Sequence, residues 1–239
     1  MLVHGIASSA ATFERLVPLI QERHRCISID LLGFGESPVP EGATYTVEEH
    51  VAAIERTIDS LQLRAPFTLV GHSLGSLLSA RYAAQHRREV THLVLVSPPV
   101  YLSPTDFADP RVRAQMGAYL KVYEFMRNNK EFTIGASAQL VKLFALGKTL
   151  ELTERNWMPF VLSLQHCIES QTTVSDIAAV AAPVDVVYGA LDQVMAPGAM
   201  KIVEQMRNVT MHRVEVSDHV LRKRLARAVA KVVNGPGTD

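Results

Sequence analysis

The sequence predicts an α/β fold in which a mostly parallel β-sheet is covered by helices. Short apolar runs alternate along the chain with stretches of helical periodicity, which is the pattern of strands joined by crossover helices. Each apolar run is nearly continuous, as expected for strands that are buried on both faces. The chain has 239 residues, 48% of them hydrophobic, which suffices for one large domain with a sizeable core.

The strands and helices of the predicted core follow from these patterns. Strands are expected at residues 2–4, 25–31, 67–71, 92–97, 184–189 and 210–216. A helix begins after Thr46, because Glu49 three residues later completes a capping box and the apolar residues that follow share one face. Another helix follows Ser73, and residues 221–233 form a terminal helix that ends at Asn234-Gly235-Pro236.

One long segment breaks the alternation of strands and helices. No convincing strand lies between Ser97 and about residue 183, where helical patterns cover residues 109–128, 134–146 and 153–170. We therefore expect a core domain of residues 1–100 and 183–239, interrupted by a helical unit of residues 101–182. Aromatic residues concentrate in this unit, and they either form its own core or line an apolar pocket. The pocket candidates are Tyr119, Tyr123, Phe144 and Trp157.

Composition and charge exclude several classes of function. The formal net charge is zero, which argues against nucleic acid or an acidic surface as the main partner. Four basic residues fit the solvent face of the terminal helix: Arg222, Lys223, Arg224 and Arg227. No metal motif, disulfide framework or phosphate loop is present, so we expect neither a metal nor a cofactor. Without an 18-residue apolar run or a signal-peptide pattern, the sequence predicts a cytoplasmic protein with no membrane span.

Ser73 is the strongest candidate for a reactive residue. It lies in "GHSLG", between an apolar strand and an amphipathic helix, and matches the G-x-S-x-G nucleophile elbow. The small residues Gly71 and Gly75 are needed because side chains there would collide with the neighbouring strand and helix. The turn would lift the serine hydroxyl clear of the sheet, at a helix N-terminus that favours developing negative charge.

A serine hydroxyl needs a base, and the base needs a carboxylate to orient it. His219 follows the last predicted strand, at the edge of the sheet where loops converge. Asp192 follows the strand at residues 184–189, again at a carboxyl end. Asp218 is the competing acid, but it adjoins His219 in sequence and would point away from the imidazole. The predicted nucleophile, acid and base are therefore Ser73, Asp192 and His219.

An oxyanion hole is predicted beside the nucleophile. Gly5 follows the first strand, and a glycine there would let a main-chain N–H face the reacting carbon. The predicted donors are the backbone N–H groups of Ile6 and Leu74.

Taken together, these motifs resemble the α/β-hydrolase fold superfamily, in particular its small, cap-bearing branch of carboxylesterases and carbon–carbon bond hydrolases. The matching pieces, in family order, are "HGIASS", "DLLGFGES", "GHSLG", "LVLVSPP", "GALD" and "DH". The resemblance implies an eight-stranded sheet of order 1-2-4-3-5-6-7-8, with a helical cap after the sixth family strand. It also implies that Ser73, Asp192 and His219 form a catalytic triad.

The chain departs from the family pattern in two places. The first two family strands are missing ahead of the His-Gly strand, so the strand at residues 25–31 is expected to be an apolar edge. We therefore suspect that upstream residues were lost through a late start, or that another chain covers this edge. In addition, Asp218 occupies a position where the family commonly has glycine.

The predicted chemistry is hydrolysis of a small to medium, mainly apolar carboxylic ester through an acyl-enzyme. A carbon–carbon bond hydrolase of a dienone acid would use the same triad plus an arginine for the substrate carboxylate. The arginine candidates are Arg111, Arg113, Arg127 and Arg155. A cofactor-free perhydrolase or haloperoxidase also remains open, as does a non-catalytic binding protein on a hydrolase scaffold. The expected partner is a small-molecule substrate, and the sequence leaves a homo-oligomer open.

Overall fold

The structure is a computed structural model that describes residues 1–63, 65–101, 110–144, 150–170, 172–195 and 197–235. Within its helices, the side chains of residues 112, 115, 116, 140–144, 197 and 199 lie outside this description. None of the helices in the described ranges is long and apolar enough to cross a membrane.

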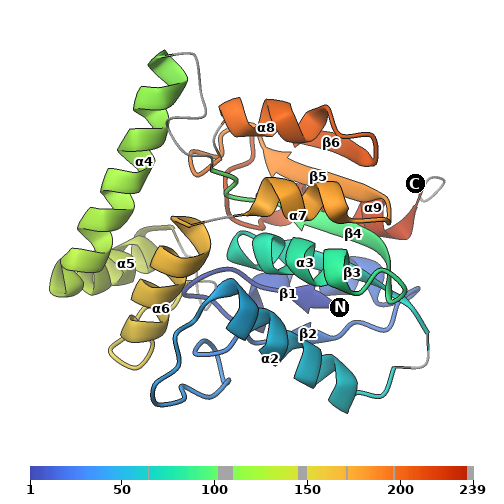
Figure 1. Cartoon of the computed structure of the whole chain (residues 1–239), viewed down its shortest axis with the longest axis horizontal. Coiled ribbons are helices and arrows are strands. Elements are labelled where there is room, and N and C mark those ends of the chain that lie inside the picture. The colour runs from blue at the N-terminus through green and yellow to red at the C-terminus, as the bar shows by residue number, and fades with distance from the viewer. Residues whose placement is uncertain (64, 102–109, 145–149, 171, 196, 236–239) are drawn as a thin grey trace.

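A six-stranded sheet forms the centre of the molecule, and each neighbouring pair of strands is parallel (Figure 1). The strands are β1 (Leu2–Val3), β2 (Ser28–Ile29), β3 (Phe67–His72), β4 (Val90–Val96), β5 (Val184–Gly189) and β6 (Val209–Val214). Their order is β2-β1-β3-β4-β5-β6. This is the order implied for the last six family strands, and it confirms the predicted parallel sheet with β2 at its edge.

The two short strands differ most from the sequence prediction. The strand expected at residues 25–31 is limited to Ser28 and Ile29, because its partner β1 offers only Leu2 and Val3 for pairing. A strand persists only where a neighbour completes its backbone hydrogen bonds. The rest of the expected strand, residues 25–27 and 30–31, has no regular secondary structure.

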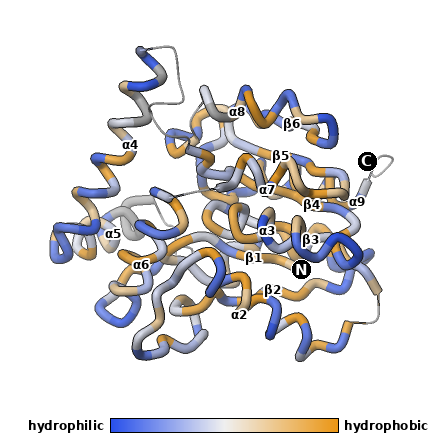
Figure 2. The backbone as a smooth tube through the Cα atoms, in the orientation of Figure 1, coloured by the Kyte–Doolittle hydropathy of each residue, from blue (hydrophilic) through white to orange (hydrophobic). Residues whose placement is uncertain are grey.

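Helices cover both faces of the sheet (Figure 1). One face carries α2 (Val47–Ser60), α3 (Leu74–Gln85), α7 (Thr173–Ala179) and α8 (Pro197–Glu204). The other face carries α9 (Lys223–Asn234), and α1 (Val17–Ile20) packs beside α9. Two apolar clusters fill the space between these layers and the strands, which run as hydrophobic segments through the centre (Figure 2). Half of the predicted capping box forms at α2: Thr46 Oγ1 accepts Glu49 N–H at 3.2 Å, whereas the Glu49 carboxylate accepts the N–H of Tyr45, the residue before the cap, at 2.6 Å.

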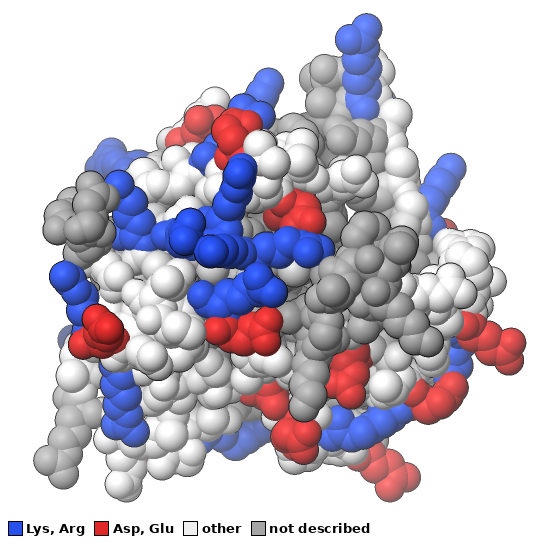
Figure 3. All heavy atoms as spheres, turned by 180° about the vertical axis from the view of Figure 1, so that it is seen from behind, with Lys and Arg blue, Asp and Glu red and all other residues white. Residues whose placement is uncertain are grey.

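Helix α9 has the basic outer face that the sequence predicts. The side chains of Arg222, Lys223, Arg224 and Arg227 are exposed, while Leu225 and Val229 are buried against the sheet. Lysine and arginine side chains gather on this rear side of the molecule (Figure 3).

Most of the segment between β4 and β5 is helical, as predicted, and lies on the side where the strands end, whereas its last helix, α7, packs against α3 over the sheet (Figure 1). It contains α4 (Pro110–Asn128), α5 (Lys130–Phe144), α6 (Trp157–Ser163) and η4, a π-helical turn at Leu164–Ile168. The helix expected at residues 153–170 begins only at Trp157, because Asn156 Oδ1 accepts Thr153 N–H at 2.7 Å and closes a turn there. One buried contact with the core joins His50 Nε2 on α2 to Ser163 Oγ at 2.9 Å.

Candidate active site

Ser73 occupies a strained turn between β3 and α3. Its backbone has φ 53° and ψ −123°, a conformation that side-chain-bearing residues rarely adopt. The chain packs so tightly here that a Cβ on Gly71 would lie 2.3 Å from the Gly75 carbonyl oxygen, and one on Gly75 would lie 2.2 Å from that of Val3. Both glycines are therefore required for the close approach of α3 to the sheet, and this approach holds Ser73 in its turn.

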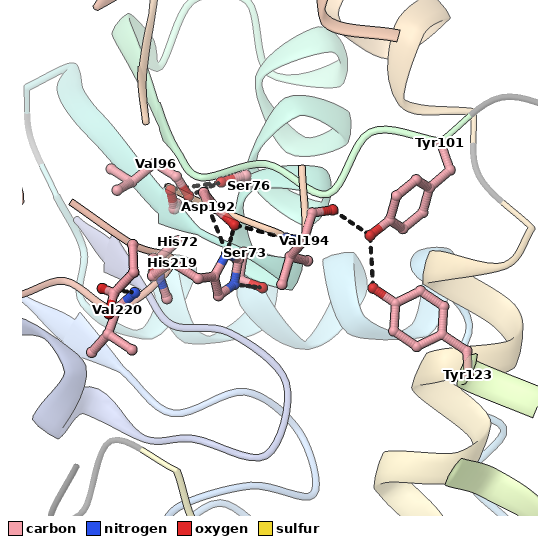
Figure 4. A network of polar contacts seen from close by, with 12 residues as sticks. His72, Ser73, Ser76, Val96, Tyr101, Tyr123, Asp192, Val194, His219 and Val220 are labelled. Atoms are coloured by element: carbon pink, nitrogen blue, oxygen red, sulfur yellow. Dashed lines mark hydrogen bonds and ion pairs between the residues drawn. The ribbon is translucent and has the colours of Figure 1, made fainter. Parts of the chain in front are cut away.

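Two further side chains meet Ser73 above the carboxyl ends of the strands (Figure 4). His219 Nε2 lies 3.0 Å from Ser73 Oγ. On the other side of the imidazole, Nδ1 lies 2.9 Å from Asp192 Oδ2 and 3.1 Å from Oδ1. The structure thus brings together, in one continuous chain of hydrogen bonds, the three residues that the sequence selected.

Each partner of Ser73 is held by its own loop. Asp192 follows β5, its side chain is fully buried, and its Oδ1 accepts Val194 N–H at 2.9 Å. His219 lies between β6 and α9, and its carbonyl oxygen is 2.9 Å from His72 Nε2. Asp218 faces elsewhere: its carboxylate accepts Val220 N–H at 3.1 Å and lies 3.5 Å from Arg222 Nε, outside the chain of hydrogen bonds.

The electrostatics of the site favour an ionised acid and a neutral supporting histidine. Burial by itself would raise the pKa of the Asp192 carboxyl, but hydrogen bonds from His219 and Val194 N–H hold it below its ordinary value. Burial lowers the pKa of His72 to about 3, and the neighbouring His219 adds to this effect. His72 is therefore neutral and donates its Nε2 proton to the His219 carbonyl.

The predicted oxyanion donors lie beside this chain of hydrogen bonds. Gly5 and Ile6 line the cavity at Ser73, and a Cβ on Gly5 would come within 2.9 Å of Ser73 Cβ. Leu74 is the first residue of α3, where helical N–H groups have no partner within the helix. Among the backbone hydrogen bonds of turns, loops and caps in the described ranges, none is donated by Ile6 N–H or Leu74 N–H.

A cavity of about 240 Å³ opens at Ser73 and His219. Its wall is mostly apolar, and the inserted segment supplies Met126, Leu150, Phe160, Leu164 and Ile168. Polar groups also line it: Ser8 Oγ and Thr12 Oγ1, 2.6 Å apart, belong to the segment after β1. The site can therefore take an apolar group next to a serine–histidine pair.

The four aromatic residues predicted for the pocket fall in different places. Tyr123 lines the cavity. Tyr119 lies behind the cavity wall and stacks on Tyr101 with ring centroids 5.3 Å apart. Trp157 is likewise one layer back, packed in the core against Phe160, because its large ring is buried between the helices. The side chain of Phe144 lies outside the described residues.

Sequence reasoning missed two residues that surround the site. His72, for which the sequence analysis gives no role, lines the cavity and donates a hydrogen bond to the His219 carbonyl. Tyr101 donates its hydroxyl to the Val194 carbonyl at 2.5 Å, next to Asp192 (Figure 4). Tyr101 follows β4 at its carboxyl end, as the other site residues follow their strands, and this position was the available signal.

No group of three or more histidine, cysteine, aspartate or glutamate side chains in the described ranges could hold a metal ion.

Comparison with known proteins identifies the family. The profile of the alpha/beta hydrolase fold family matches residues 1–221. The Arabidopsis thaliana protein named "Probable lysophospholipase BODYGUARD 3" is 37% identical over 115 residues, which is 46% of this chain and 23% of that protein. This chain therefore matches only about a quarter of that relative's length.

Solved structures share the fold across nearly the whole chain. An esterase from Exiguobacterium antarcticum superposes with a TM-score of 0.76 at 17% identity, covering 98% of this chain and 91% of that one. A meta-cleavage product hydrolase from Pseudomonas fluorescens superposes with a TM-score of 0.65 at 19% identity, covering 98% and 89%. At such identities the likeness concerns the fold alone.

Proposed function

The chain belongs to the alpha/beta hydrolase fold family, and we propose that it is a serine hydrolase that cleaves small to medium, mainly apolar carboxylic esters. The observation that carries the proposal is the continuous contact from Ser73 Oγ through the His219 imidazole to the buried Asp192 carboxylate. A histidine that bonds a serine through Nε2 and a carboxylate through Nδ1 has the geometry of a general base with a fixed tautomer.

The proposed reaction proceeds through two acyl-transfer steps. Ser73 Oγ attacks the ester carbonyl carbon while His219 Nε2 takes the hydroxyl proton, and the carbonyl electrons move onto its oxygen. Collapse of this tetrahedral intermediate expels the alcohol, which takes the proton from His219 and leaves an acyl group on Ser73. Water then attacks the acyl carbon in the same way, releases the carboxylic acid and regenerates the Ser73 hydroxyl.

Asp192 and the backbone N–H groups of Ile6 and Leu74 have separate proposed roles. Asp192 stays ionised and stabilises the imidazolium that forms in each step, in line with the lowered pKa of its carboxyl. The N–H groups of Ile6 and Leu74 bind the negative oxygen of the intermediate, and one such donor is typically worth about 3 kcal/mol of barrier.

The inserted segment, residues 101–182, is proposed to act as a cap that supplies the acyl- or alcohol-binding wall. Its side chains in the cavity are aliphatic, aromatic or methionine apart from the Tyr123 hydroxyl. The name of one relative supports an ester as substrate, because it is called a probable lysophospholipase.

The carbon–carbon bond hydrolase alternative lacks its expected cation. Among the described residues, no arginine or lysine lines the cavity. Two of the arginine candidates are committed elsewhere: Arg127 Nε lies 3.1 Å from Glu169, and Arg155 donates to the Gly35 and Ser37 carbonyls at 2.8 and 2.6 Å. In the part of the wall that the structure describes, a substrate carboxylate would meet neither arginine nor lysine, which favours the ester reaction.

A fluorophosphonate probe tests the nucleophile directly. We expect covalent labelling of the protein at Ser73, abolished by Ser73→Ala and strongly reduced by His219→Ala. Ser79→Ala is the matched control, because it removes a buried hydroxyl from the same helix without touching the site. Folded protein that resists the probe and leaves p-nitrophenyl acetate and butyrate intact would instead indicate a non-catalytic binding protein.

A further inference from the structure

The loop that carries Asp192 is tied to two tyrosines from different parts of the chain (Figure 4). Asp192 Oδ1 accepts Val194 N–H at 2.9 Å, and the Val194 carbonyl lies 2.5 Å from the Tyr101 hydroxyl. The Tyr101 hydroxyl is in turn 2.7 Å from that of Tyr123 on α4. A single path of hydrogen bonds therefore runs from the inserted segment to the proposed catalytic acid.

The direction of each bond in this path is fixed by elementary rules. A carbonyl oxygen can only accept, so Tyr101 donates its single hydroxyl proton to Val194. The Tyr101 oxygen must then accept the bond from Tyr123, which makes Tyr123 the donor. The Tyr123 proton thus points to the Tyr101 oxygen, and the Tyr101 proton points to the Val194 carbonyl.

Both tyrosines keep their protons under ordinary conditions. Burial raises the pKa of Tyr101 far above its ordinary value, and the adjacent Tyr123 adds to the effect. Burial likewise raises the pKa of Tyr123, to about 12, even though its bond to Tyr101 acts in the opposite direction. Changes measured near neutral pH in variants of this path therefore cannot come from ionisation of a tyrosine.

The path connects the cavity wall with the turn at Asp192. Tyr123 and Met126 on α4 line the cavity, and so does Val194. Tyr101 is buried behind these residues, and its ring stacks on that of Tyr119, which also belongs to α4. The position of α4 over the cavity and the position of the Val194 backbone are thus coupled through one hydroxyl group.

We propose that Tyr101 and Tyr123 are positioning residues that hold the Asp192–Val194 turn. Through them, the Asp192 carboxylate is aligned with His219 only when α4 lies in its place over the cavity. The proposal rests on the proposed function, in which Asp192 orients the base. Tyr101 acts directly on the turn, and Tyr123 acts through Tyr101. The inserted segment would then contribute to the alignment of the acid as well as to the cavity wall.

Three tyrosine-to-phenylalanine variants separate this role from packing. Tyr101→Phe removes the bond to Val194, Tyr123→Phe removes only the outer bond, and Tyr119→Phe is the matched control. Tyr119 shares the helix and the aromatic cluster, but its hydroxyl makes no hydrogen bond within the described residues. We expect kcat on p-nitrophenyl butyrate to fall about tenfold in Tyr101→Phe and about threefold in Tyr123→Phe, with KM changed less than about twofold. Tyr119→Phe should match the parent protein.

A spectroscopic readout tests the alignment without any substrate. The proton between His219 Nδ1 and the Asp192 carboxylate is expected to give a low-field proton NMR resonance, which His219→Ala removes. Tyr101→Phe should broaden this resonance or move it upfield, whereas Tyr119→Phe should leave it in place.

These measurements distinguish failure of the inference from failure of the proposed function. If Asp192→Asn abolishes turnover while Tyr101→Phe and Tyr119→Phe behave alike in both assays, the positioning role is wrong and the serine hydrolase stands. If Ser73→Ala and Asp192→Asn leave turnover intact, the proposed function is wrong and the positioning role loses its basis with it. A rise in KM with unchanged kcat in Tyr101→Phe would also overturn the proposal, since it would indicate a contact with substrate.

Discussion

At the amino end of β5, Asp185 binds two histidines, while beyond the carboxyl end of the same strand Asp192 binds one. Asp185 Oδ2 lies 2.6 Å from His92 Nε2 on β4, and its Oδ1 lies 2.5 Å from His212 Nε2 on β6. We call Asp185, His92 and His212 the lower cluster, and Ser73, His219 and Asp192 the upper cluster. Both pair a carboxylate with imidazole groups from neighbouring strands or the loops that follow them, so their differences show what the proposed serine hydrolase site needs.

The clusters differ in which imidazole nitrogen the carboxylate holds. In the lower cluster Asp185 binds the Nε2 atom of both histidines, so the tips of the two rings point at the carboxylate. In the upper cluster Asp192 binds Nδ1 and leaves Nε2 of His219 for Ser73. Only the second arrangement lets an oriented imidazole reach a third group.

The surroundings differ as much as the pairs. His92, Asp185 and His212 share a sheet face with Val94, Val187 and Val214, the face that α9 covers. The upper cluster lies where strands end, beside a strained serine and a cavity. A carboxylate–histidine pair can therefore serve the fold alone. It can form a catalytic site only where a nucleophile and space for a substrate lie beside it.

The largest expected contrast comes from removing one histidine from each cluster. His219→Ala should lower kcat/KM for p-nitrophenyl butyrate by roughly 10⁵- to 10⁶-fold, because no base remains for Ser73. His212→Ala, the matched change in the lower cluster, should leave kcat/KM within about twofold. Equal losses in the two variants, with both proteins folded by circular dichroism, would remove the distinction between the clusters.

Replacing each aspartate by asparagine is the next largest test. Asp192→Asn should reduce kcat by about 10⁴-fold, because the neutral amide no longer stabilises the imidazolium or fixes its tautomer. Asp185→Asn should keep nearly full activity at 25 °C. Retained activity in Asp192→Asn would mean that another carboxylate serves the base.

The upper cluster could be predicted because each of its parts has a local signature. Ser73 sits in a motif whose glycines are required by the close packing of α3 on β1. Asp192 and His219 each follow a strand, and parallel strands end at the same edge of a sheet. Nothing beyond strand order was needed to place them together.

What sequence could not supply depends on contacts between distant residues. Tyr101 and Val194 meet beyond the ends of the adjacent strands β4 and β5 although they are 93 positions apart, and neither belongs to a recognisable motif. The length of β2 depends on the two residues that β1 offers, which hydrophobicity alone cannot reveal. Trp157 fits an apolar pocket as well as a core by its composition, and packing against Phe160 decides between them.

Acid should affect the stability of both clusters in the same way. Burial would raise the pKa of the Asp185 carboxyl, but hydrogen bonds from His92 and His212 hold it below the ordinary value of 3.8. The stabilisation is therefore complete above that value and is lost as pH falls through the lowered pKa of the folded protein. We expect Asp185→Asn to cost about 2 kcal/mol of unfolding free energy at pH 7 and clearly less at pH 3.

Urea unfolding at the two pH values measures this difference. Asp192→Asn should show the same trend, because the pKa of its carboxyl is lowered as well. An Asp185→Asn penalty that is constant from pH 7 to pH 3 would mean that the ionised carboxylate contributes nothing to the folded state.

The smallest effect is expected at Asp218, which adjoins the upper cluster without joining it. Its side chain is 48% exposed, and it faces Arg222 and the Val220 N–H instead of the His219 imidazole. Solvent and salt screen a charge in that position, so Asp218→Asn should change kcat/KM by less than about twofold. The same variant assayed at low and high salt separates a long-range charge effect from a direct contact. A loss as large as that of Asp192→Asn would transfer the role of the acid to Asp218, and the comparison of the two ends of β5 would then no longer explain the activity.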